Sequence, residues 1–118
     1  MKRIKVRINR KRWLRGTPDG SVLRNENGSM CCLGHVARAC SIKASTLVDR
    51  LTPSEVPDAE CKKSFFYRLI SRTLHDADNS IACYDIMDLN DEEGIAQDKR
   101  EKALTKKLSK LGFDVSFF

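Results

Sequence analysis

The chain has 118 residues, of which 41% are hydrophobic and 32% are charged, and its formal net charge is +6. This composition is typical of a soluble globular protein and excludes a disordered or fibrous one. We expect one domain over residues 1–118, long enough to bury a single core without disulfides or metal. No segment has the apolar length of a membrane span or signal peptide, and the five cysteines are an odd number. We therefore expect a reducing compartment, the cytoplasm.

The first predicted element is a strand over residues 3–8. Apolar residues at positions 4, 6 and 8 alternate with cations at positions 3, 5 and 7, so one face would be buried and the other lined with positive charge. An alternative is that these cations only discourage pairing with the edges of other sheets.

The positive charge is concentrated at the start of the chain. Of the 22 Lys and Arg residues, eight precede the first acidic residue, Asp19. A local basic patch indicates a local anionic partner, and arginines around a tryptophan suit phosphates, stacked bases or an acidic protein surface. Alternatively, Trp13 anchors the turn in the core and the cations stay solvated. The candidate binding residues are Arg3, Lys5, Arg7, Arg10, Lys11, Arg12, Trp13 and Arg15.

A turn at residues 16–20 follows, and then a predicted hairpin. Two short segments, residues 21–25 and 29–33, flank the Asn27-Gly28 pair, which tolerates the positive φ that tight hairpin turns need. An apolar stripe with helical spacing runs through Leu33, Val36, Ala37 and Cys40. A short helix should therefore follow the hairpin.

Further helices are predicted by apolar periodicity and by end signals. Gly112 marks the end of the last helix, and the alternating residues after it predict a final strand. The predicted elements are helices over residues 45–51, 59–75, 78–90 and 96–111, and a strand over residues 113–118. We therefore expect an α+β fold, in which a small, mainly antiparallel sheet of the N-terminal strand, the C-terminal strand and the hairpin is packed by three to five helices.

Two adjacent cysteines and a histidine mark the start of the first helix. Cys32 and His35 are three residues apart and could face one another as thiolate and base. Together with Cys31 and Cys40 they could also be considered as zinc ligands, although the paired spacing of common zinc sites is missing. Small buried residues entering an amphipathic helix have the same pattern, and we favour core packing for these cysteines and for Cys61 and Cys83. We assign no catalytic or metal-binding residue and expect no cofactor.

The chain resembles small uncharacterised proteins encoded by bacteriophages and prophages. The resemblance rests on Arg12-Trp13-Leu14-Arg15-Gly16, Gly28-Ser29-Met30-Cys31-Cys32-Leu33-Gly34, Leu89-Asn90-Asp91 and the ending Leu111-Gly112-Phe113-Asp114-Val115-Ser116-Phe117. It implies a protein that acts on host machinery in the bacterial cytoplasm, for instance an anti-CRISPR or related anti-defence inhibitor.

Three functional hypotheses follow. The first is a non-enzymatic inhibitor that binds a host defence protein or ribonucleoprotein, a nucleic acid or a nucleotide signal through its basic N-terminal surface. The second is a small nucleic-acid-binding regulator, which predicts steep salt dependence. The third is a cysteine- or metal-dependent enzyme. No membrane partner is expected, and the oligomeric state is left open.

Overall fold

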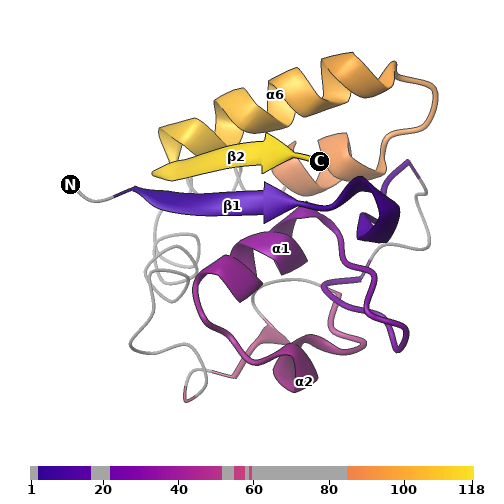
Figure 1. The fold of residues 1–118 in the computed structure, drawn as a ribbon. Coiled ribbons are helices and arrows are strands. Elements are labelled where there is room, and N and C mark those ends of the chain that lie inside the picture. Colours follow the sequence, from indigo (N-terminus) through magenta and orange to yellow (C-terminus); the bar gives the residue numbers. More distant parts are fainter. Residues whose placement is uncertain (1–2, 17–21, 52–54, 58, 60–84) are drawn as a thin grey trace.

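The computed structural model describes residues 3–16, 22–51, 55–57, 59 and 85–118 (Figure 1). Residues 85–91 are helical. The predicted helix over residues 59–75 and the first half of the one over residues 78–90 fall outside the described residues, except for residue 59. The other elements in chain order are strand β1 (Ile4–Ile8), the short 3-10 helix η1 (Arg10–Arg12), helices α1 (Cys32–Ala39), α2 (Ala44–Leu47) and α6 (Gln97–Lys110), and strand β2 (Phe113–Phe117).

Strands β1 and β2 form a two-stranded sheet, so the first and last predicted strands do pair (Figure 1). Their direction was predicted wrongly, because the strands are parallel, with Ile4 opposite Phe113 and Ile8 opposite Phe117. The reason is the position of α6, which runs back along the sheet and ends beside the start of β1. After Gly112 (φ 97°), whose carbonyl accepts from the Ile4 N–H at 3.1 Å, the chain turns and enters β2 alongside β1.

The predicted hairpin is also wrong, because its two arms are not paired strands. The Cys31 N–H does donate to the Val22 carbonyl at 3.1 Å, but the β-bridges of the arms are made with other segments. Arg24 forms a parallel bridge with Val48, and Met30 forms one with Trp13. The Asn27-Gly28 pair does make a tight turn, closed by the Asn25 N–H donating to the Ser29 carbonyl at 2.8 Å. A turn signal therefore placed the reversal, but the pairing partners of the flanking residues were set by the rest of the fold.

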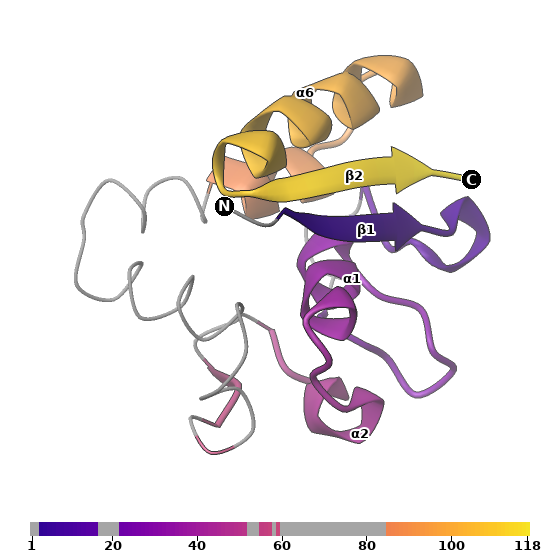
Figure 2. The same cartoon turned by 60° about the vertical axis from the view of Figure 1, so that its left-hand side comes forward.

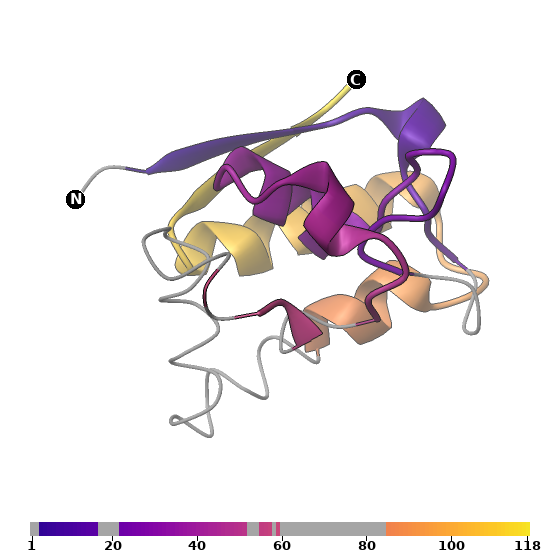
Figure 3. The same cartoon turned by 90° about the horizontal axis from the view of Figure 1, so that it is seen from below.

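The sheet has one covered face and one exposed face. Figure 2 shows α1 next to β1 and α6 next to β2, and Figure 3 shows that both helices lie on the same side of the sheet. The predicted alternation is confirmed, since Val6, Ile8 and Phe113 are buried on the covered side while Lys5 and Arg7 are exposed. The cations of β1 consequently project from a face that no described element covers.

Helices α1 and α6 follow their predicted apolar stripes. In α1 the residues Leu33, Val36 and Ala37 are buried, and Cys40 caps the helix end. In α6 the buried residues are Arg100, Leu104 and Leu108, which confirms the predicted inward face. The second short helix ends earlier than predicted, at Leu47 rather than residue 51.

Candidate anion-binding surface

The N-terminal cations divide into a group with internal partners and a group without. Arg3 belongs to the first group, because its guanidinium donates to the Asp114 carboxylate at 2.6 Å and to the Ser109 hydroxyl at 2.8 Å. It therefore ties the start of β1 to the turn between α6 and β2.

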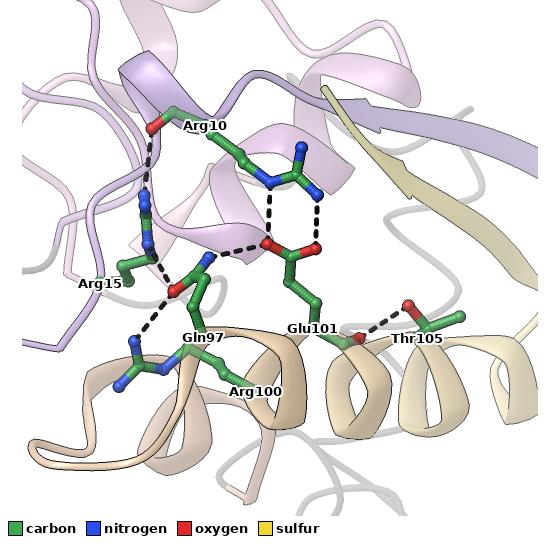
Figure 4. A network of polar contacts seen from close by, with 6 residues as sticks. All are labelled: Arg10, Arg15, Gln97, Arg100, Glu101 and Thr105. Atoms are coloured by element: carbon green, nitrogen blue, oxygen red, sulfur yellow. Dashed lines mark hydrogen bonds and ion pairs between the residues drawn. The ribbon is translucent and has the colours of Figure 1, made fainter.

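Arg10 and Arg15 also have partners within the fold (Figure 4). Arg10 donates two hydrogen bonds of 2.8 and 2.7 Å to the Glu101 carboxylate. This pairing lowers the pKa of Glu101. Arg15 donates to the Gln97 side-chain carbonyl and to the backbone carbonyls of Arg10 and Trp13, each at 3.0 Å. Both arginines thus connect the η1 turn to α6.

Partial burial destabilises the charged form of Arg15. Its pKa is lowered, first by partial burial and then by the neighbouring Arg100 guanidinium, whose Nη2 donates to the Glu92 carbonyl. Both arginines donate to the same Gln97 oxygen. Both guanidiniums are held by neutral carbonyls, and neither forms an ion pair within the described residues.

Trp13 lies in the core and not on the surface. It is 5% exposed, and its indole N–H donates to the Asn90 side-chain oxygen at 2.8 Å. The Phe117 ring packs against it with centroids 4.9 Å apart, and the Arg15 guanidinium lies 4.5 Å from its centroid. Because the indole is buried and packed against these two side chains, a nucleic-acid base cannot stack on it.

Four of the N-terminal cations are exposed and have no ion-pair partner in the described part of the chain, and we name them the outer cations. They project from the open face of β1 and from η1. Arg7 lies over the Phe118 ring, 4.7 Å from its centroid, and Arg12 reaches the Asn27 carbonyl at 3.4 Å. The outer cations are Lys5, Arg7, Lys11 and Arg12.

Arg24 extends this surface, although no pattern in the sequence pointed to it. The turn at Gly28 brings the Arg12 and Arg24 guanidiniums together. A Cβ built on Gly28 would lie 3.1 Å from the former and 3.2 Å from the latter. A glycine with φ of 92° therefore allows two cations to lie against one turn. Only the three-dimensional path of residues 22–30 could reveal this neighbour.

Cys31 and His35 differ from the exposed outer cations, because both are buried. Burial raises the pKa of the Cys31 thiol to about 11 and lowers the pKa of His35 to about 4, helped by the nearby positive charge of Arg24. The cavity beside Cys31 and Cys32 measures about 20 Å³, room for about one water molecule. Core packing is confirmed for Cys31, Cys32 and Cys40, while Cys61 and Cys83 fall outside the described residues.

No metal site is formed by the residues considered as zinc ligands. Cys31, Cys32, His35 and Cys40 all lie in the described part of the chain, and there no three His, Cys, Asp or Glu side chains come together as metal ligands would. Among these same described segments, no helix is long and apolar enough to cross a membrane.

Comparison with known proteins adds no relative to this description. No protein-family model, no curated protein and no solved structure matches the chain.

Proposed function

We propose that the protein is a non-enzymatic binding protein that uses its outer cations to hold an anionic host partner. The observation that carries this proposal is the unequal use of the N-terminal charge. Arg3, Arg10 and Arg15 are bonded to other side chains of the protein, whereas the outer cations are exposed without a carboxylate partner in the described residues. A row of uncompensated cations on a rigid strand and turn attracts and orients an anionic surface.

A binding role also agrees with the environment of the cysteines. A nucleophilic cysteine needs a thiolate, but burial raises the pKa of Cys31 to about 11. The adjoining cavity of about 20 Å³ is far below the volume of about 300 Å³ from which small-molecule sites begin. These two features argue against nucleophilic chemistry at Cys31.

The expected partner is a component of a bacterial defence system. The resemblance to phage and prophage proteins implies this setting, and the outer cations supply a means of contact with an acidic protein surface, a guide RNA or a nucleotide signal. An inhibitor of this kind acts by covering an acidic surface of its target or by binding the target's RNA or nucleotide directly.

A nucleic-acid-binding regulator is the second candidate. The proximity of Arg12 and Arg24 at the Gly28 turn favours it, because two guanidiniums can hold neighbouring phosphate oxygens. With Trp13 buried, such binding would use phosphate contacts and not base stacking. Its affinity would then fall steeply with salt, in proportion to the phosphates neutralised.

The test is purification from a bacterial host at low salt, followed by native mass spectrometry and the ratio of absorbance at 260 and 280 nm. Extra mass with a raised ratio identifies a nucleic acid or nucleotide, and extra mass without it identifies a protein. The same measurement is then made on a variant carrying Lys5→Gln, Arg7→Gln, Lys11→Gln and Arg12→Gln. We expect this variant to lose the partner.

Two controls separate binding from folding. A variant with Lys99→Gln and Lys107→Gln removes charge from α6 away from the outer cations and should keep the partner. Circular dichroism should show that the outer-cation variant is folded, because none of its four changes removes a buried group. The proposal is wrong if the folded outer-cation variant retains the same partner in the same amount.

A further inference from the structure

The sheet has a second exposed feature, which is the outer edge of β2. Hydrogen bonds to β1 use the Gly112 carbonyl and both backbone groups of Phe118. Because successive residues of a strand point their backbone groups to opposite sides, those of Val115 and Phe117 face away from β1. No hydrogen bond of these outward groups occurs within the described residues. An unpaired edge of this kind is a template for another strand.

Arg3 limits how much of this edge is available. Its guanidinium reaches across the start of β2 to the Phe113 carbonyl at 3.4 Å and to Ser109. The start of the edge is therefore already engaged by the chain itself. The open part runs from Val115 to Phe117.

A groove of about 660 Å³ lies between this edge and the exposed side of α6, and we name it the α6–β2 groove. Phe117 contributes from β2, and Lys102, Lys106 and Lys110 contribute from α6. These lysines are four residues apart and so follow one side of the helix. An added strand would lie about 5 Å from β2, and every second side chain would point into this groove.

The charge of the groove favours an acidic occupant. Three lysines face it, against Asp98 and Glu101, and the Glu101 carboxylate is already held by Arg10. Asp98 stands one helical turn before Lys102, so the positive charge increases toward the Lys110 end. Acidic side chains at alternate positions of an extended segment would meet Lys102, Lys106 and Lys110 in turn.

We propose that the open edge of β2 and the α6–β2 groove bind an extended acidic segment of a partner protein, which adds to the sheet as a third strand. Backbone hydrogen bonds at Val115 and Phe117 supply sequence-independent affinity, and the lysines select carboxylates. This surface is separate from the outer cations, so the two proposals can fail independently.

The test uses a fluorescein-labelled peptide of seven residues, Glu-Thr-Glu-Val-Glu-Thr-Glu, and measures fluorescence anisotropy at physiological salt. We expect saturable binding that the variant with Lys102→Gln and Lys106→Gln weakens about fivefold to tenfold. The charge-matched control with Lys99→Gln and Lys107→Gln should bind as the unmodified protein does, because neither residue lines the groove.

Val115→Pro tests the backbone pairing. Proline removes an N–H that faces away from β1, so the β1–β2 ladder is kept while the added strand loses a hydrogen bond. We expect at least about a tenfold loss of peptide affinity, because a blocked edge admits no neighbouring strand, and no loss with Val115→Ala. Should Val115→Pro fail to fold, the lysine variants and a peptide methylated at alternate backbone nitrogens test the same point.

Three outcomes would overturn this inference. Equal binding of the peptide by the Lys102/Lys106 variant and by the unmodified protein would remove the groove from the interaction. Loss of peptide binding in the outer-cation variant alone would assign the acidic segment to the surface of β1 and η1. A concentration-dependent dimer that Val115→Pro abolishes would identify the occupant as a second copy of this chain.

Discussion

Residues 10–16 contact the rest of the fold on two sides that differ in depth. On the inner side, Asn90 is 1% exposed and bonds to the Trp13 indole, the Leu14 carbonyl and the Gly16 N–H. On the outer side, Arg10 bonds to Glu101 of α6, where the Arg10 side chain is 46% exposed and that of Glu101 14%. The same short segment is thus fixed by neutral hydrogen bonds inside and by charged ones outside.

The difference in depth indicates which contacts contribute most to stability and which contribute little. A buried hydrogen-bonding group that loses its partner keeps its full desolvation penalty, whereas an exposed ion pair is replaced by water. Asn90 also accepts from the Cys32 N–H at 3.1 Å, so it caps α1, whose own N-cap residue makes no side-chain bond. We therefore expect the inner contacts to dominate stability.

Gly34→Ala should give the largest loss in the free energy of unfolding. Gly34 packs so closely on the Leu23 backbone that an added Cβ would lie 1.8 Å from its carbonyl oxygen. Because backbone cannot rotate aside as a side chain can, we expect about 4 kcal/mol of destabilisation in urea unfolding. Gly94→Asn is the control, since space is open there and asparagine tolerates positive φ. Equal stability of the two variants would contradict the close approach.

Asn90→Ala should come next, at about 3 kcal/mol, because it leaves buried donors of Trp13 and Cys32 without their acceptor. Urea unfolding followed by tryptophan fluorescence measures it. Asn27→Ala changes an exposed asparagine and should shift stability by less than about 0.5 kcal/mol. Asn90→Asp keeps an acceptor but cannot donate to the Leu14 carbonyl, so it should be only partly tolerated.

His35 provides a pH test of the inner side. Burial lowers the pKa of its imidazole from 6.5 to about 4, and the nearby charge of Arg24 adds to this lowering. The unfolded chain therefore binds this proton first on acidification, so the free energy of unfolding falls as the pH drops from about 6.5 toward 4. The slope contributed by this group reaches ~1.4 kcal/mol per pH unit. A His35→Phe variant should lack this contribution, and an unchanged slope in that variant would rule it out.

Glu101→Gln should give the smallest effect. It weakens the contact with Arg10 on the outer side, and we expect the thermal midpoint to move by less than about 2 °C, and less still at high salt. Carboxyl NMR should show the pKa of Glu101 below its ordinary value, because Arg10 stabilises the charged form. This stability is present at neutral pH and is lost as the pH falls through the lowered pKa. If Glu101→Gln destabilised the protein as much as Asn90→Ala, the outer contacts would matter as much as the inner ones, contrary to our expectation.

Local periodicity was sufficient to predict most described elements. The alternation of residues 4–8 and 113–117 and the stripes of α1 and α6 each reflect one buried face, which any partner would require. The pairing direction of β1 and β2 leaves no such trace, because parallel and antiparallel strands bury the same alternate residues. For the same reason, the arms of the predicted hairpin gave no sign that Arg24 would bond to Val48 and Met30 to Trp13.

The sequence was enough to predict which residues form the candidate surface, but not which of them are exposed and which are paired with other side chains. The count of N-terminal cations could not separate the outer cations from Arg10, because Glu101 reaches Arg10 from 91 residues away. Asn90 had no local signal either, since its side chain bonds to residues 13, 14 and 32, which are distant in the sequence. Side chains that join distant segments are recognised only when the fold is known.

The parallel pairing of β1 and β2 has a consequence for how the protein is made. Arg3 and its partner Asp114 are separated by 111 positions, so β1 leaves the ribosome long before β2 exists. At about 5–20 residues per second, the first strand waits several seconds or more with its backbone unpaired. The sheet therefore closes only after the last strand has emerged from the ribosomal tunnel, and until then the cations of β1 protect a nascent edge from pairing with other chains.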